Sequence, residues 1–203
     1  MSKTLIPEFL NYGGRLLDNH DVLKILSNRK NKVSLELLNK DENRVIEVET
    51  EFLFIACGSI GSPELLLRSG FRGNIGKGLQ MHPSFKFTAV FDEQVNHTGM
   101  GVPVHQVKEF SPKISLGCSI SSKAFLALNL NDCGALDRID EWEKMAAYYS
   151  MISPEGRGRV RCSRFFKNPI VSFFLTKQDK VDLRLSILRL AEVLLSAGAV
   201  ELF

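Results

Sequence analysis

The sequence predicts an α/β fold followed by an α+β fold, on three observations. Residues 52–56 are continuously apolar and run through a turn of small residues into a leucine-rich helix pattern. Such a run is typical of a strand buried on both faces of a parallel sheet, so strand, turn and helix make half of a βαβ unit. From Phe85 onward, apolar and polar residues alternate in short stretches, which indicates antiparallel strands. Residues 176–198 carry an amphipathic pattern that predicts a long C-terminal helix.

Length, composition and charge exclude several classes of protein. The chain has 203 residues, enough for one large domain or two small ones. Its 44% hydrophobic and 24% charged residues lie near globular averages, which excludes a wholly disordered or collagen-like chain. The formal net charge is +3, and the basic residues are dispersed among acids. Charge therefore gives no reason to expect nucleic acid as a partner.

Neither a membrane span nor a metal site is expected. No apolar run approaches the roughly 18 residues that a spanning helix needs, and the N-terminus lacks the apolar core of a secretory signal. We therefore expect a cytoplasmic protein. The cysteines lie too far apart in the sequence to form a zinc or redox pair, and we expect buried free thiols at Cys57, Cys118, Cys133 and Cys162.

The first fifty residues predict a short helix and three strands. The helix is expected from Thr4 to Gly13. Strands are expected at residues 22–26, 32–38 and 44–48. Apolar and polar residues alternate along the last two, so these should form a hairpin with one solvated face.

The turn after residues 52–56 is the first candidate for ligand binding. It spans residues 57–61, and the following helix is expected to begin with Ser62 as cap and Pro63 in the first turn and to end at Gly70. Glycines let a ligand approach the backbone, and a helix start binds anions. An ordinary strand-to-helix turn is the alternative, and the sequence contains no GxGxxG motif.

The second half of the chain predicts mainly antiparallel strands. Beyond the alternating stretch from Phe85 to Phe91, strand candidates lie at residues 114–120, 147–152 and 170–175, and a short helix at residues 137–144.

The last helix has the clearest start and end of any predicted element. Thr176 and Asp179 are spaced as in a capping box, and Gly198 follows the end. The pattern predicts that the face directed to the core carries Val181, Leu185, Leu188, Ala191 and Leu195.

A basic run at residues 157–164 allows two interpretations. Arg157, Arg159 and Arg161 alternate, so they should share one face of a strand, with Arg164 nearby. Such a face can hold a phosphate or a nucleic-acid backbone. A solvated or salt-bridged sheet face is favoured, because no aromatic platform or second basic cluster accompanies the run.

Residues 50–70 resemble the second signature of the glucose–methanol–choline (GMC) family of flavin oxidoreductases. In that family a buried strand leads into an Ala-x-Gly turn, then Gly-Ser-Pro and a leucine-rich helix ending in Ser-Gly, as here at Ala56 to Gly58, Gly61 to Pro63 and Ser69 to Gly70. The chain departs from the pattern at Arg72, where the family has glycine. Residues 78–83 and 154–160 resemble the family's entry to the substrate domain and the strand opening its C-terminal region.

The resemblance implies a domain organisation and a set of cofactor contacts. It implies a partial FAD-binding, Rossmann-like domain at residues 1–84 and an incomplete substrate domain at residues 85–203, built as an antiparallel sheet with helices. His82 would lie on the substrate side, with a turn or packing role as the alternative. The FAD contacts implied are Val22 on the adenine and, around the turn, Ala56, Cys57, Gly58, Ser59 and Ser62.

The resemblance also implies a reaction, together with an alternative to it. The family's type of activity is FAD-dependent oxidation of a CH–OH group in a small-molecule alcohol or sterol, with hydride transfer to the flavin. The family's GxGxxG and catalytic histidine lie outside the matching stretches, so we expect an interior part of such an enzyme that is inactive alone. The alternative is a non-catalytic truncated or split-gene product that needs a companion chain to bind FAD. An unrelated α+β binding domain is the remaining possibility.

Overall fold

The computed structural model describes residues 3–26, 32–101, 103–163 and 165–203. These residues form two compact units. Unit 1 contains the described residues up to Lys77 together with Arg159–Ser172, and unit 2 contains Gly78–Gly158 and Phe173–Phe203. The division at residue 84 that the resemblance implies remains a prediction about the functional domains.

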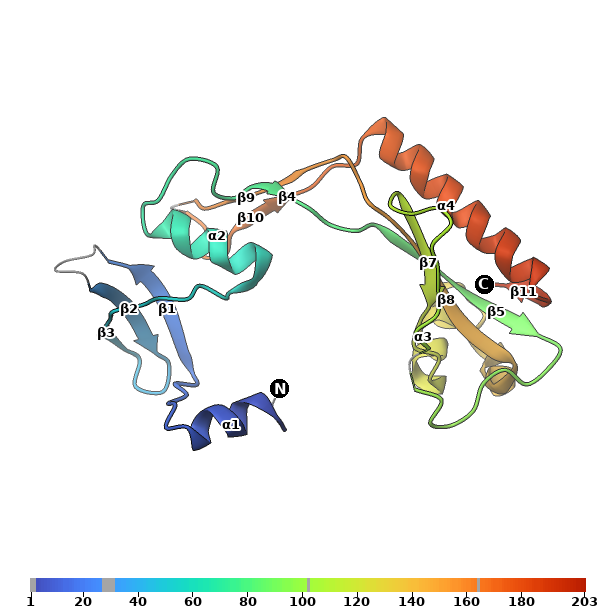
Figure 1. Ribbon diagram of the computed structural model, residues 1–203, viewed down its shortest axis with the longest axis horizontal. Helices are drawn as coiled ribbons and strands as arrows, with labels where there is room; N and C mark the ends of the chain where they lie inside the picture. The colour runs from blue at the N-terminus through green and yellow to red at the C-terminus, as the bar shows by residue number, and fades with distance from the viewer. Residues whose placement is uncertain (1–2, 27–31, 102, 164) are drawn as a thin grey trace. The chain divides into compact units, whose positions relative to one another are not determined.

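Unit 1 begins with a helix and an antiparallel sheet, as the sequence predicts (Figure 1). In the register of the hairpin Leu35 faces Val48 and Leu37 faces Ile46. These side chains are buried or half-buried, whereas the alternate residues of the last strand are exposed, so the predicted solvated face is confirmed. The elements are α1 (Leu5–Asn11), β1 (His20–Ile25), β2 (Val33–Asn39) and β3 (Arg44–Thr50), with strand order β1-β2-β3.

The strand predicted at residues 52–56 is wrong. Phe52 is 77% exposed and Phe54 is 91% exposed, and no strand within the described ranges pairs with this segment. A continuously apolar strand is stable only when neighbours pair with both edges and cover both faces. The described residues supply neither, so helix and antiparallel sheet are confirmed and the Rossmann-like arrangement is not observed.

The helix after this segment, α2 (Gly58–Arg68), starts five residues earlier than predicted, with Cys57 instead of Ser62 at the N-cap position. Gly58 has φ +78° and turns the chain directly into the helix. The Ser62 hydroxyl accepts a hydrogen bond from the Cys57 N–H at 3.1 Å, so Ser62 lies within the first turns and Pro63 lies inside the helix. The predicted end is confirmed, because Gly70 follows the helix with φ +92°.

A second three-stranded sheet carries the basic run. Along its central strand, Val160 is buried while Arg159 and Arg161 are exposed on the other face, as their alternation predicts. Neither arginine forms an ion pair with any residue that the structure describes, which fits a solvated face rather than a salt-bridged one. Arg164 lies outside the described residues. The strands, in the order β10-β9-β4, are β10 (Ile170–Ser172), β9 (Gly158–Arg161) and β4 (Lys77–Leu79).

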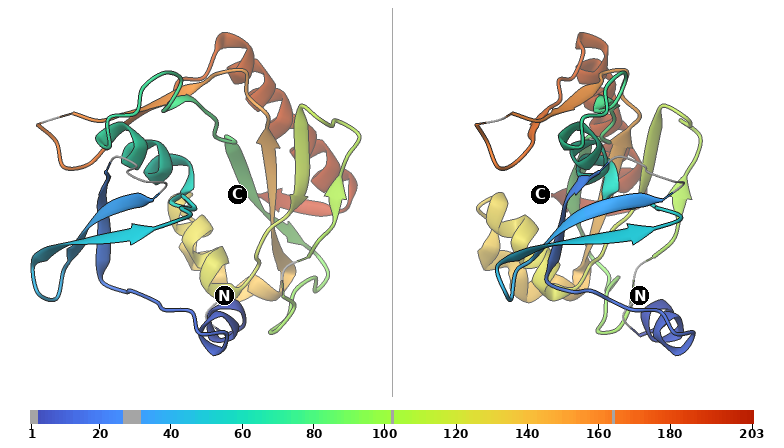
Figure 2. Two further views of the ribbon diagram at one scale, coloured as in Figure 1. Left: turned by 60° about the vertical axis from the view of Figure 1, so that its left-hand side comes forward. Right: turned by 90° about the vertical axis from the view of Figure 1, so that its left-hand side faces the viewer.

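The sheet of unit 2 has five strands in the order β11-β5-β8-β7-β6. The pairs with a defined register are antiparallel, as predicted, and β5, β8 and β7 run side by side in both figures (Figure 2). The strands are β5 (Ser84–Phe91), β6 (Gln106–Val107), β7 (Ile114–Cys118), β8 (Met145–Ile152) and β11 (Ala199–Leu202).

Three elements of unit 2 were not predicted from the sequence, and one of them is the two-residue strand β6. The helix α3 (Lys123–Asp132) was missed, because its leucines and alanines are spread around the helix and give no single apolar stripe. The strand β11 has only four residues, too few for a clear alternation. The short helix predicted near residues 137–144 is present as a 3₁₀ helix, η1 (Leu136–Lys144).

The core of unit 2 consists of two layers, one on each face of the sheet. Ala89 and Val90 are consecutive in β5 and therefore point to opposite faces. Ala89 packs with Leu190 and Leu194 of α4 (Lys177–Ser196). Val90 packs in a separate cluster that includes Leu126 and Leu130 of α3. A helix thus covers each face of the sheet.

The helix α4 is present as predicted, but it buries the opposite face. Its capping box is confirmed. Three polar side chains of α4 are buried instead of the predicted apolar stripe: Asp179, Asp182 and Ser186. They have partners on other elements: the Asp182 carboxylate lies 3.0 Å from the Lys113 ammonium, and the Ser186 hydroxyl donates to the Ser150 hydroxyl at 3.2 Å.

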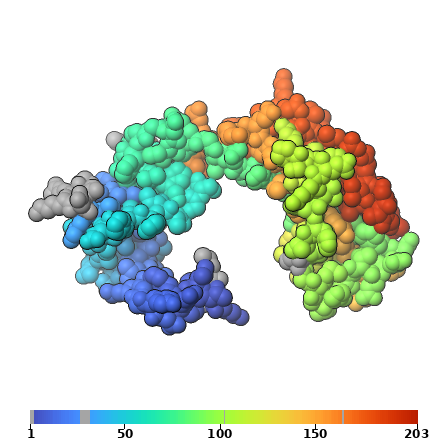
Figure 3. Space-filling view, in the orientation of Figure 1, coloured from blue at the N-terminus to red at the C-terminus, as the bar shows by residue number. Residues whose placement is uncertain are grey.

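The leucines of the predicted stripe lie at the surface of unit 2, where α4 forms the outer edge in the space-filling view (Figure 3). Sequence periodicity identifies an apolar face but not the partners that polar residues find in the fold. Those partners decided which face is buried.

Asp179 connects α4 to the loop that precedes β9. Its carboxylate accepts hydrogen bonds from three backbone N–H groups, those of Glu155 at 2.7 Å, Gly156 at 3.0 Å and Thr176 at 2.8 Å. Burial raises the pKa of this carboxyl, but the N–H donors and the Thr176 hydroxyl together lower it to about 2. A Cβ on Gly156 would lie 2.9 Å from the carboxylate and 2.4 Å from the Phe174 carbonyl oxygen, so glycine is required there.

The four cysteines are free, as expected, but not all are buried. Cys57 and Cys133 are exposed because each lies at a helix end, and Cys118 and Cys162 are half-buried. Burial raises the pKa of the Cys118 thiol. Within the described ranges, no helix is long and apolar enough to cross a membrane, and no cluster of side chains could hold a metal ion.

The Asp179 contacts predict a defined loss of stability in acid. Because the folded-state pKa is about 2 and the unfolded value is about 3.9, the ionised carboxylate stabilises the fold above about pH 4. This contribution is lost as the pH falls through about 2. We expect Asp179→Asn to lower the free energy of unfolding at neutral pH and to reduce its dependence on pH between about 4 and 2, measured by urea denaturation followed by circular dichroism. Asp140→Asn, whose side chain is 93% exposed, is the control and should change neither quantity measurably.

Candidate functional site

Two of the predicted cofactor residues line one cavity in unit 1. Val22 of β1 and Cys57 at the start of α2 border a hollow of about 520 Å³, together with Gly61, Glu64 and Arg68 of α2. This volume lies in the range of small-molecule sites. Val22 is 41% exposed, so its apolar side chain is available to a ligand.

A hydrogen-bond relay holds the two walls of this cavity together. The Ile25 N–H of β1 donates to the Ser69 hydroxyl at 2.8 Å, and this hydroxyl donates to the Leu65 carbonyl oxygen of α2 at 2.6 Å. Ile25 and Leu65 are also buried side chains of unit 1. The relay satisfies a strand N–H and fixes β1 beside the C-terminal part of α2.

The turn at the other end of α2 exposes its backbone. Nothing lies within 4 Å of the position that a Cβ on Gly58 would occupy, so the glycine is required by its positive φ rather than by crowding. The first N–H groups of a helix, here those of Gly58 and Ser59, have no intrahelical acceptor and favour an anionic or polar ligand group. Both residues are exposed.

Charges of both signs surround the cavity and are largely paired with each other. The Arg68 guanidinium contacts the Glu64 carboxylate at 2.9 Å and donates to the Lys167 carbonyl oxygen. The Asp21 carboxylate contacts the Lys40 ammonium at 2.7 Å. The remaining polar lining includes Lys167. Glu64, Arg68 and Lys167 were not among the predicted site residues, and the i, i+4 spacing of the first two is the only signal of them in the sequence.

The cavity suits one half of a flavin dinucleotide. An exposed apolar strand residue, Val22, can support a flat aromatic ring, and the open start of α2 can donate hydrogen bonds to a polar group. These features fit the adenosine part of FAD. The predicted contacts Ala56, Gly58, Ser59 and Ser62 do not line the cavity; they lie beside Cys57 in the chain, at or within the start of α2.

His82, the predicted substrate-side residue, belongs to unit 2. It is exposed, and its Nδ1 lies 3.3 Å from the Ile152 carbonyl oxygen at the end of β8. A contact between a ring nitrogen and a backbone carbonyl oxygen is typical of a packing or turn residue, which is the alternative to a substrate-side role.

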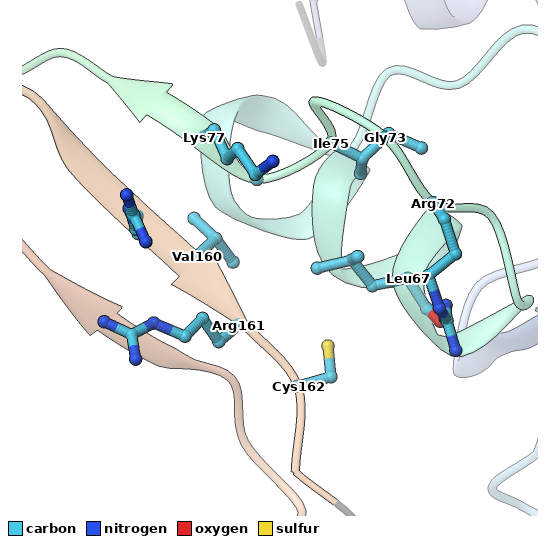
Figure 4. A pocket seen from close by; sticks show the side chains of 10 residues that line it. Leu67, Arg72, Gly73, Ile75, Lys77, Val160, Arg161 and Cys162 are labelled. Carbon is cyan, nitrogen blue, oxygen red and sulfur yellow. The ribbon is translucent and has the colours of Figure 1, made fainter.

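A second cavity in unit 1, of about 440 Å³, lies between α2 and β9 (Figure 4). The side chains of Leu67, Val160 and Cys162 lie between these elements, and Arg72 and Lys77 lie around them. The Arg72 guanidinium donates to the Leu67 and Phe71 carbonyl oxygens and thereby completes the end of α2. None of the predicted cofactor residues lines this cavity, so we assign it no part in the candidate site.

Comparison with known proteins finds relatives among the GMC oxidoreductases. A family model described as GMC oxidoreductase matches residues 1–84, which include β1, α2, the turn that leads into α2, and His82. An uncharacterized GMC-type oxidoreductase of Sinorhizobium fredii is 33% identical over 204 residues, covering 98% of this chain and 40% of that protein.

More distant relatives agree with this assignment. The long-chain-alcohol oxidase FAO1 of Arabidopsis thaliana is 28% identical over 81% of this chain and 23% of its own length. An uncharacterized GMC-type oxidoreductase of Mycobacterium tuberculosis is 24% identical over 97% of this chain and 32% of its own length. The chain belongs to the GMC oxidoreductase family and spans at most about 40% of the length of these relatives.

The positive φ of Gly58 predicts a measurable cost for any side chain there. We expect Gly58→Ala to lower the free energy of unfolding by about 1 kcal/mol, because an L-residue in the left-handed region is strained although the surrounding space is open. Thermal unfolding followed by circular dichroism measures this cost. Ser59→Ala, next in the helix and equally exposed, should be neutral or slightly stabilising. Equal behaviour of the two variants would show that Gly58 does not hold this conformation.

Proposed function

We propose that the chain is part of an FAD-dependent oxidoreductase that acts on CH–OH groups of an alcohol or a sterol. The observation that carries the proposal is the shared cavity of Val22 and Cys57 beside the open start of α2. Family membership supports it, since FAD binding is a general property of GMC oxidoreductases.

In this proposal the residues of unit 1 position the cofactor. Val22 contributes an apolar surface to the adenine ring. Ala56, Cys57, Gly58 and Ser59 bring their backbone close to the dinucleotide, and the Ser62 hydroxyl keeps the Cys57 N–H oriented across the first turn of α2 at 3.1 Å.

The bound flavin would supply the hydride acceptor for the carbon that loses its hydrogen. The protein's task is then to exclude water, orient the alcohol and take the hydroxyl proton. We assign no residue of this chain as the base that takes it. His82 is proposed on the substrate side, where its Nε2 would contact the substrate while Nδ1 stays near the Ile152 carbonyl oxygen.

We propose a hydrophobic, long-chain alcohol or a sterol as the substrate class. One relative is named as a long-chain-alcohol oxidase, at 28% identity. We also propose the cytoplasm as the compartment, since free thiols at the four cysteines are the state expected in a reducing environment. Nucleic acid is not proposed as a partner.

A second candidate function is a non-catalytic product that binds FAD only with a companion chain. The exposure of Phe52 and Phe54 favours it, because a fully apolar segment leaves water when a partner strand covers it. The pyrophosphate-binding GxGxxG is absent from the 203 residues, as is any residue to which we assign the catalytic proton transfer.

Titration of the purified chain with FAD, followed by flavin fluorescence, separates the two candidates. If the Val22 cavity binds the adenosine part, Val22→Asp should raise the dissociation constant about tenfold or more, because it places a carboxylate against an apolar ring. Val45→Asp is the matched control, since Val45 is a similarly exposed valine on β3 of the same sheet. It should leave the dissociation constant unchanged.

The results of this titration decide between the two candidate functions. Saturable binding that Val22→Asp weakens and Val45→Asp does not supports the cofactor site and counts against an obligatory companion. Equal weakening by both variants contradicts the assigned cavity. Absence of binding by the unaltered chain favours the companion candidate, which the coding sequence on either side can then test for a GxGxxG upstream and a catalytic histidine segment downstream.

The exposed phenylalanines give a further prediction for the companion candidate. Phe52→Ser combined with Phe54→Ser should change the free energy of unfolding by less than about 0.5 kcal/mol, because neither side chain is packed. The same pair should reduce binding of a hydrophobic dye to the folded chain. A large loss of stability would show instead that the segment is buried and paired in solution.

A further inference from the structure

The outer face of α4 carries an apolar surface that no described residue of unit 2 covers. We define this face by four side chains, with exposed fractions of 55% for Val181, 42% for Leu185, 60% for Leu188 and 53% for Leu195. Spacings of three, four and seven residues place them on one side of the helix. Phe174, three residues before α4, is 76% exposed.

The helix cannot turn this face toward the sheet. Its inner face is fixed by the Asp179 contacts, by the ion pair of Asp182 with Lys113 and by the burial of Leu190 and Leu194 in the core. Rotation would bury leucines only by removing two carboxylates from their partners, and an unpaired buried charge is strongly destabilising. The leucines of the outer face therefore stay at the surface of the folded unit.

Positive charge lies beside these apolar side chains. Lys177, Lys180 and Arg184 are exposed, and they form no ion pair with any residue in the described part of the chain. Arg184 is one helical turn from both Lys180 and Leu188, so basic and apolar groups are neighbours. The Arg189 guanidinium contacts the Glu192 carboxylate at 2.8 Å, which leaves a net positive outer face.

We propose that the outer face of α4 docks onto an anionic phospholipid surface, with the helix lying in the plane of the interface. The leucines and Val181 would enter the boundary between head groups and acyl chains, and the three cations would contact lipid phosphates. A helix with an apolar side and a basic flank is typical of such peripheral binding. This binding is distinct from crossing a membrane.

Charge favours a lipid surface over a second copy of the chain. Two outer faces brought together would oppose three unpaired cations with three more, which is unfavourable in the low dielectric of an interface. An anionic membrane supplies both the apolar layer and the compensating charge. The proposal does not depend on FAD binding, because all of its residues lie in unit 2 and the cofactor cavity lies in unit 1.

Vesicle co-sedimentation of the 203-residue chain tests the proposal. We expect binding to vesicles of phosphatidylcholine with phosphatidylglycerol, weaker binding to phosphatidylcholine alone, and a decrease as salt is raised. Leu185→Ser combined with Leu188→Ser should weaken binding about tenfold or more. Leu128→Ser is the matched control, since Leu128 on α3 is 64% exposed, and it should bind normally.

A second pair of variants separates specific docking from general charge attraction. Lys180→Gln combined with Arg184→Gln should weaken binding to the anionic vesicles about tenfold. Lys24→Gln combined with Lys108→Gln removes the same charge from exposed positions elsewhere and should have a much smaller effect. Circular dichroism checks that all variants remain folded.

Three results would overturn the proposal. The first is the absence of binding to anionic vesicles at low salt. The second is equal weakening by the outer-face variants and their controls. The third is a dimer in light scattering that Leu185→Ser with Leu188→Ser disperses, because a second copy would then be the occupant of this face.

Discussion

The carboxylate of Asp179 is the contact on which the arrangement of unit 2 depends. It is fully buried, accepts a hydrogen bond from the Thr176 N–H at the start of α4, and accepts two more from the N–H groups of Glu155 and Gly156 in the loop before β9. One side chain thereby fixes both where α4 starts and how the chain leaves β8. The donors around it outweigh the cost of burying a charge, as its lowered pKa reflects. Gly156 leaves room for this approach.

The same contact determines which side of α4 faces water. Once Asp179 is held inward, Asp182 and Ser186 follow on the same side and meet Lys113 and Ser150. Leu190 and Leu194 complete the inner face by packing on the sheet. Val181, Leu185 and Leu188 then lie on the outer face. The inward position of Asp179 therefore explains both the buried polar contacts and the exposed leucines.

Unit 1 differs from unit 2 in that fewer of its side chains are buried and more of its apolar side chains are exposed. Its strand β1 and helix α2 are joined through the Ser69 hydroxyl, and the cavity between them borders Val22 and Cys57. Next to this site, Phe52 and Phe54 lie exposed. A dinucleotide or a partner strand would each cover apolar surface here, and for this reason both candidate functions involve the same region.

The sequence by itself determined the local features of this protein. Alternation predicted the β2–β3 hairpin and β5, the capping box predicted α4, and residues 50–70 carried the resemblance to the GMC family that the comparisons confirm. These signals depend on neighbours within a few residues, so one chain suffices to detect them. The tertiary structure decided that no described strand pairs with residues 52–56, that polar side chains join Leu190 and Leu194 on the buried face of α4, and that Val22 and Cys57 border one cavity. Each of these outcomes depends on partners far away in the chain, such as Lys113 for Asp182 and Ser69 for Ile25, and no local pattern specifies where those partners lie.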